Sequence, residues 1–167
     1  MKRLLLIRHA KSSWDDPALS DHDRPLAPRG RRAAERMRAH LEGGDLRPGL
    51  VLCSSSKRTR ETLDILAPAF ADAERSIEEE LYGADRTELL ERLHEVPDDI
   101  RTVALIGHNP GVQDLALKLA GEGTDMDRIR EKFPTGALAV LGFDGPWPGL
   151  GGGTARLLSF VAPRDLG

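Results

Sequence analysis

The sequence contains little cysteine, few aromatic residues and no excess of basic charge. Its single cysteine, Cys53, cannot form an internal disulfide, so the cysteine content does not indicate a secreted protein. The formal net charge is −3, which argues against the overall basic field that nucleic-acid binding requires. An anionic ligand would therefore need a local cluster of positive charge.

Long apolar runs are also missing. The start resembles the opening of a signal peptide, but its apolar run covers only the four residues from Leu4 to Ile7 before Arg8 and His9 interrupt it. The apolar region of a signal peptide needs about 7–15 residues, and a membrane-spanning helix needs roughly 18. We therefore expect a cytoplasmic protein that does not insert into a membrane.

The overall composition is that of an ordinary globular protein. It has 167 residues, of which 40% are apolar and 31% charged, and this suits a single domain over residues 1–167. Strands alternate with helices, which favours a three-layer α/β/α sandwich around a mostly parallel sheet. The last two strands flank a loop rich in Gly and Pro, which predicts a hairpin and an antiparallel edge strand. The predicted strands are Arg3 to Arg8, Leu50 to Ser54, Thr102 to Gly107, Ala137 to Phe143 and Ala155 to Val161.

Helical periodicity fills the segments between these strands. One helix is predicted from the shared face of Ala33, Met37 and Leu41, and Gly43 and Gly44 end it. A second is predicted from Thr59 to Phe70, and Pro68 bends or shortens it. A third begins at Asp85 with a capping box. In a fourth, Asn109 is the expected N-cap, Pro110 takes the first helical position, and Gly121 ends the helix.

Three of the predicted strands end in residues suited to phosphate chemistry. Arg8 and His9 follow the first strand, the segment 54–58 follows the second, and the segment 107–109 follows the third. In open α/β sheets, ligands bind beyond the carboxyl ends of the strands. Two helix N-termini and the guanidinium groups of Arg8 and Arg58 would then converge on one anion site. Arg24, Lys11 and Lys57 add candidates for further positive charge.

The histidines of this cluster suggest covalent catalysis. A neutral imidazole nitrogen of His9 can attack phosphorus, and His108 can stabilise the transferring group or move a proton. A metal site formed by both histidines with Asp15, Asp16 or Asp21 is the alternative. It is disfavoured because no short ligand-like spacing of histidines exists and Arg8 would repel a cation. We therefore expect neither metal nor cofactor.

Three motifs together resemble those of the histidine phosphatase superfamily, also called phosphoglycerate-mutase-like. The segment from Leu6 to Ala10 is similar to its Arg-His-Gly signature, with Ala10 in place of Gly. The segments 54–62 and 105–111 are similar to its second and third motifs. The segment 23–30 and the small size resemble the SixA-type phosphohistidine phosphatase branch.

The resemblance implies a role for each matching residue. His9 would accept the phosphoryl group, Arg8, Arg58 and His108 would complete the phosphate pocket, and Arg24 would reach the phosphate or the substrate. Further phosphate-binding candidates at the same sheet edge are Lys11, Ser54 and Asn109. Many superfamily members also have a glutamate acid, and here Glu78, Glu79, Glu80 or a loop aspartate is the candidate, with a solvated acidic edge as the alternative.

Three functions fit this reading, and each makes a different demand on the pocket. A phosphatase acting on phosphohistidine of a partner protein needs an open site. A small-molecule phosphomonoesterase needs a lid, which the loop from Lys11 to Ala27 with Trp14 could supply; otherwise Trp14 packs on the domain surface. Both release inorganic phosphate. A non-catalytic phosphate-binding module needs no nucleophile. The sequence leaves the physiological substrate, the oligomeric state and the pH optimum open.

Overall fold

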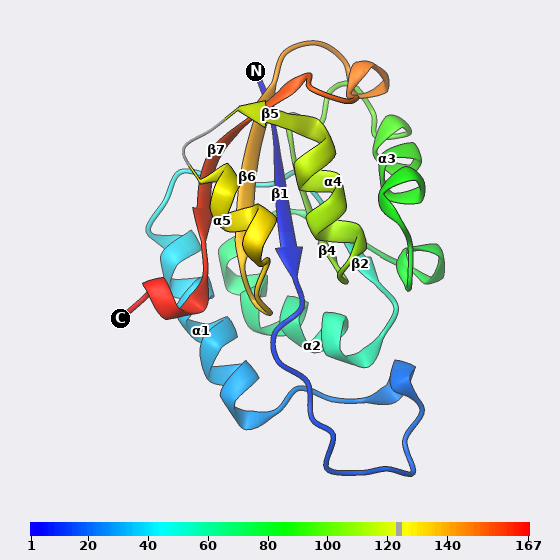
Figure 1. Cartoon of the computed structure of the whole chain (residues 1–167), viewed down its shortest axis with the longest axis vertical. Helices are drawn as coiled ribbons and strands as arrows, with labels where there is room; N and C mark the ends of the chain where they lie inside the picture. Colours follow the sequence, from blue (N-terminus) through cyan, green and yellow to red (C-terminus); the bar gives the residue numbers. More distant parts are fainter. Residues whose placement is uncertain (123–124) are drawn as a thin grey trace.

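The computed structural model describes residues 1–122 and 125–167. These residues include a seven-stranded sheet with the order β3-β2-β4-β1-β6-β7-β5 (Figure 1). Its strands are β1 (Lys2–Arg8), β2 (Leu50–Ser54), β3 (Glu74–Glu78), β4 (Thr102–Gly107), β5 (Ala120–Glu122), β6 (Leu138–Phe143) and β7 (Ala155–Val161).

The strand directions confirm a mostly parallel sheet with antiparallel pairing toward one edge. β1, β2, β3 and β4 pair in parallel, whereas β6 runs antiparallel to both β1 and β7. Two short edge strands were not predicted. β3 is largely exposed and carries three charged residues, so its sequence lacks an apolar signal. β5 pairs with β7 where Gly121 was expected to end the preceding helix.

Helices cover both faces of the sheet, which completes the predicted α/β/α sandwich (Figure 1). Alternate side chains of β1 point to opposite layers: Leu5 and Ile7 join the core with α1 and α2, while Leu4 and Leu6 join the core with α3, α4 and α5. The helices are α1 (Pro28–Glu42), α2 (Lys57–Leu66), α3 (Arg86–His94), α4 (Gly111–Leu119) and α5 (Met126–Glu131).

The predicted helix boundaries were correct in two cases and wrong in a third. Asp85 and Glu88 form the expected capping box, and Pro68 lies in the 3-10 turn that follows α2. Asn109 is not the N-cap of α4, because Pro110 holds that position and the helix begins at Gly111. The Asn109 side chain still accepts a hydrogen bond from the N–H of Gln113 at 3.2 Å. None of the helices described is long and apolar enough to cross a membrane.

Candidate active site

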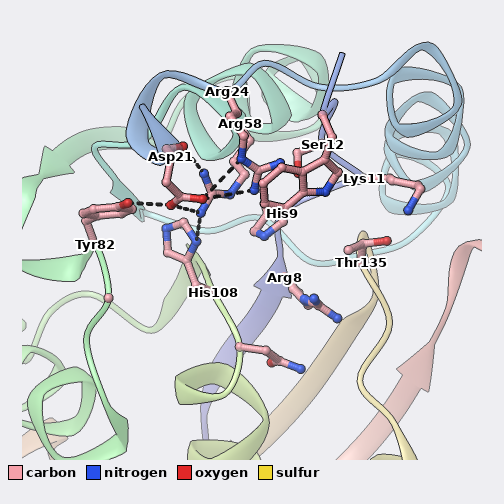
Figure 2. A pocket seen from close by; sticks show the side chains of 13 residues that line it. Arg8, His9, Lys11, Ser12, Asp21, Arg24, Arg58, Tyr82, His108 and Thr135 are labelled. Atoms are coloured by element: carbon pink, nitrogen blue, oxygen red, sulfur yellow. Dashed lines mark hydrogen bonds and ion pairs between the residues drawn. The ribbon is translucent and has the colours of Figure 1, made fainter. Parts of the chain in front are cut away.

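A pocket of about 550 Å³ opens at the carboxyl ends of β1, β2 and β4 (Figure 2). The parallel pairing of these strands brings three distant sequence segments to this edge. Of the catalytic and phosphate-binding candidates, Ser54 and Lys57 do not line the pocket. The candidates that line it are Arg8, His9, Lys11, Arg24, Arg58, His108 and Asn109. Asp21 and Tyr82 line it as well.

His9 lies directly after β1 and is only 7% exposed. Its Nδ1 lies 2.7 Å from the carbonyl oxygen of Ala10. A carbonyl only accepts hydrogen bonds, so Nδ1 carries the proton and Nε2 keeps its lone pair. Burial, and then the charges of the neighbouring histidine and arginines, lower the pKa of His9 to about 3. At neutral pH the side chain is therefore an uncharged imidazole with a free Nε2, which is the state that a nucleophile needs.

Two arginines, the buried Arg58 and the half-buried Arg8, form the positive part of the pocket. Arg8 donates from Nη1 to the carbonyl oxygen of Phe133 at 2.8 Å. Arg58, in the first turn of α2, donates to the backbone carbonyl of Asp21 at 2.6 Å and to its carboxylate at 3.0 Å. Among the described residues, the buried Nε atoms of both arginines have no hydrogen-bond partner. Two guanidinium groups that line one cavity form a positively charged site that suits an anion.

His108 stands beside the nucleophile at the end of β4, with its ring centre 5.3 Å from that of His9. Its Nε2 lies 2.8 Å from the hydroxyl of Ser54, and its Nδ1 lies 3.5 Å from Nη2 of Arg58. An arginine can only donate, so Nδ1 is the acceptor and Nε2 carries the proton. Burial, followed by the charge of Arg58, lowers the pKa of His108 to about 4. Ser54 is fully buried, hydrogen-bonds to His108 and does not line the pocket, so its position fits a contact with His108 better than one with phosphate.

Asp21 and Tyr82 complete the site and were not predicted as parts of a phosphate pocket. The carboxylate of Asp21 accepts hydrogen bonds from Tyr82 Oη, from Arg58 and from Arg24 (Figure 2). The hydrogen bond from Tyr82, together with those from the two arginines, lowers the pKa of Asp21 to about 2. The carboxylate is therefore charged at neutral pH and occupies donors that a phosphate would use.

The remaining candidates lie around the rim of the pocket. Arg24 donates to the Ser12 hydroxyl at 2.8 Å and to the Ser13 carbonyl at 3.2 Å. Asn109 donates from Nδ2 to the Phe133 carbonyl at 3.2 Å, the same oxygen that Arg8 uses. Lys11 is exposed, so its ammonium group can reach a ligand from solvent. These positions give the rim both positive charge and neutral donors.

The start of the loop after His9 is fixed by a close backbone contact. The backbone N–H of Ala27 donates to the Lys11 carbonyl at 2.9 Å, and Ser12 pairs with Leu26 in an isolated bridge. A Cβ on Gly30 would lie only 2.1 Å from the same Lys11 oxygen. Glycine at position 30 therefore allows α1 to pack directly against the segment that follows the nucleophile.

Trp14 lies at the pocket with its indole stacked on Arg24, a residue of the same loop. The indole is 74% exposed and lines the pocket. Its contact lies beneath it, where the Cζ atom of Arg24 is 3.4 Å from the ring centre.

The three candidate glutamates Glu78, Glu79 and Glu80 do not line the pocket. Glu78 accepts hydrogen bonds from Nε and Nη2 of Arg92 at 2.7 and 2.9 Å. Asp21 is the loop aspartate that does reach the pocket. Across the part of the chain that the structure describes, no group of three or more His, Cys, Asp or Glu side chains is arranged to hold a metal ion.

Comparison with known proteins gives consistent matches. A family model described as the histidine phosphatase superfamily (branch 1) matches residues 4–108. An uncharacterised protein of Mycobacterium tuberculosis is 43% identical over 167 residues, covering 95% of this chain and 100% of the relative.

Two solved structures assigned as phosphohistidine phosphatase SixA have a similar fold. The protein from Nakamurella multipartitia has a TM-score of 0.85 and 33% identity, with 97% of this chain and 96% of the other covered. The protein from Agrobacterium tumefaciens also has a TM-score of 0.85, with 30% identity and coverage of 97% and 98%.

Proposed function

The chain belongs to the histidine phosphatase superfamily and to its SixA-type branch, and from this premise we propose that it is a metal-independent phosphatase that removes the phosphoryl group from phosphohistidine of a partner protein. The observation that carries the proposal is the state of His9. Its Nδ1–H is held by the Ala10 carbonyl, so the free Nε2 is left to act in a cavity that Arg8 and Arg58 make positive.

The reaction proceeds in two steps at Nε2 of His9. In the first, Nε2 attacks phosphorus, a new N–P bond forms, and the bond from phosphorus to the leaving group breaks with its electron pair going to that group. The imidazole ring becomes cationic, and the hydrogen bond from Nδ1–H to the Ala10 carbonyl stabilises this charge. In the second, water attacks phosphorus, the N–P bond returns its electrons to Nε2, and inorganic phosphate leaves with the oxygen and protons of the water.

The arginines supply most of the catalytic stabilisation in this scheme. Phosphoryl transfer depends on positioning and on neutralising charge at the three peripheral oxygens. Arg8 and Arg58 line the pocket, and their guanidinium groups are the cations available for that task. The adjacent His108 can take up a proton through Nδ1 once a bound phosphate adds negative charge beside it.

The proposed preference for phosphohistidine rests on the lack of a protonated carboxylic acid among the described residues that line the pocket. Glu78, Glu79 and Glu80 lie away from it, and Asp21 is ionised because its pKa is lowered to about 2. An alkoxide leaving group needs a proton donor, whereas a protonated phosphohistidine departs as neutral imidazole, whose conjugate acid has a pKa near ~6.5. The pocket therefore suits a phosphoramidate better than a phosphate ester.

A small-molecule phosphomonoesterase is the second candidate. The cavity of about 550 Å³ has the volume of a metabolite site, which favours this alternative. In that case Tyr82, whose hydroxyl donates a hydrogen bond to Asp21, is a pocket-lining group that could help to protonate an ester oxygen.

The proposal is tested by assaying purified protein in EDTA with para-nitrophenyl phosphate and, separately, with a phosphohistidine-bearing protein. Wild type is compared with His9→Ala. We expect turnover that survives EDTA, disappears in His9→Ala and is faster with phosphohistidine. Faster turnover of the ester would select the phosphomonoesterase, and loss of activity in EDTA would refute metal independence. Phosphate binding without any turnover would indicate a binding module instead.

A further inference from the structure

Trp14 has an unusual position for a large apolar side chain. At 74% exposure it is the most exposed large hydrophobic residue in the described part of the chain. Tryptophan is normally buried over most of its surface, and exposed aromatic groups at a cavity often contact a ligand or partner. Trp14 lines the same pocket as His9, so the group that it could contact is one attached to the bound phosphate.

The indole is held from one side only. The guanidinium of Arg24 stacks beneath it, with Cζ 3.4 Å from the ring centre. Hydrogen bonds to Asp21, Ser12 and Ser13 fix this guanidinium, and Arg24 is just 7% exposed. The buried and hydrogen-bonded guanidinium of Arg24 therefore holds one face of the indole in a fixed position, while the rest of the ring remains exposed to solvent.

The pocket is divided into a phosphate-binding floor and an aromatic rim. His9 and Arg58 on the floor are buried, whereas Trp14 at the rim is exposed. Tyr82 also lines the pocket, and its ring lies edge-on to that of His108 with centres 5.4 Å apart. A phosphate bound on the floor leaves its substituent to project past the rim, where flat aromatic surfaces are available.

We propose that Trp14 is a specificity residue whose indole stacks against a planar leaving group, such as the imidazole ring of phosphohistidine. This deepens the proposed function and rests on it. A planar ring gains most from an aromatic face. The site should therefore discriminate against aliphatic substituents on phosphate.

Binding of phosphonates tests this independently of catalysis, because phosphoryl transfer does not cleave their P–C bond. Isothermal titration calorimetry would compare phenylphosphonate with methylphosphonate on wild type, Trp14→Ala, Trp14→Phe and Leu19→Ala. Leu19 is the matched control, since it is a 38%-exposed apolar residue of the same loop that does not line the pocket. We expect wild type to prefer phenylphosphonate by about three- to tenfold, the range that one aromatic stacking contact supplies.

The variants separate stacking from a purely structural role. Trp14→Ala should lose the preference for the phenyl group while binding methylphosphonate within about twofold of wild type, and Trp14→Phe should restore most of that preference. Leu19→Ala should behave as wild type. Equal losses for both phosphonates in Trp14→Ala would mean that Trp14 only supports Arg24, which overturns the proposal. An unchanged preference in Trp14→Ala would overturn it too.

Failure of this inference can be told apart from failure of the proposed function. The phosphonate preference reports the rim alone, whereas the His9→Ala turnover assay reports the nucleophile. Turnover that depends on His9 without any phenyl preference would refute the role of Trp14 and leave the phosphatase intact. A phenyl preference that depends on Trp14, in a protein without turnover, would refute the phosphatase and leave the stacking site.

Discussion

Lowering the pH from 7 to 5 should leave the His9 nucleophile almost completely in its reactive form. Burial and the surrounding positive charges lower the pKa of His9 to about 3. Burial and the charge of Arg58 likewise lower the pKa of His108 to about 4. Both side chains are therefore neutral over a range in which an ordinary histidine becomes protonated.

The size of the expected effect follows from these values. With a pKa of about 3, roughly 99% of His9 is still neutral at pH 5. A histidine with the ordinary pKa of about 6.5 would be neutral in only about 3% of molecules at pH 5, and its reactivity would fall roughly 25-fold from pH 7. The two cases are far enough apart for steady-state kinetics to distinguish them.

The assay is the pH profile of kcat/KM, which reports the ionisation of groups in the free enzyme. The profile is corrected for the ionisation of the substrate, and the titration of the His9 ring is followed by NMR, with His9→Ala identifying its signals. We expect no acid limb between pH 7 and 5. A limb or an NMR midpoint near 6.5 would refute the argument that burial keeps the nucleophile neutral.

The same pKa shifts affect stability in a defined direction. Below pH 6.5 the unfolded chain protonates these two histidines, whereas the folded protein does not until the pH approaches 4 for His108 and 3 for His9. The two neutral histidines therefore contribute their full share of the unfolding free energy above pH 6.5, and this share is lost as the pH falls. Between pH 6.5 and 5 each histidine should lower the unfolding free energy by roughly 1.6 kcal/mol. Replacing both by Gln should flatten this part of a denaturant-based stability profile.

Three further substitutions test separate parts of the structure. Asp21→Asn should bind inorganic phosphate about fivefold more tightly by calorimetry, because it removes a negative charge that shares an arginine with the ligand; weaker binding would contradict this. Gly30→Ala should lower the unfolding free energy by roughly 1–3 kcal/mol although alanine usually favours helices, since its Cβ would lie 2.1 Å from the Lys11 oxygen; an unchanged Tm would show that α1 is free to shift. Glu78→Gln should cost roughly 1–2 kcal/mol of stability through its bonds to Arg92 yet leave kcat within about twofold; a large fall in kcat would identify Glu78 as the acid.

The sequence by itself determined the framework and the core of the candidate site. Buried apolar strands and capped helices predicted the layers, and the ends of parallel strands must meet at one edge of a sheet. Arg8 and His9, Arg58, and His108 therefore converge for a topological reason that local patterns reveal. The same local patterns contain the three motifs by which the chain resembles its superfamily.

The polar edge strands could not be predicted in this way. β3 forms because its backbone pairs with β2, and its exposed, mostly polar side chains contribute no apolar alternation to read. β5 is only three residues long and depends on pairing with the distant β7. Such strands form through backbone hydrogen bonds, which every residue type except proline can donate and accept, so the sequence pattern does not indicate them.

Only the tertiary structure determined the pKa values of the pocket residues and which side chains surround the pocket. Asp21 meets Arg58, 37 residues away, and Tyr82, 61 residues away, through a loop whose conformation depends on those contacts. The low pKa of His9 comes from burial, which no single residue encodes. Trp14 is placed over Arg24 by the same loop. These features depend on distances between segments far apart in the chain, and only the packing of the whole fold sets such distances.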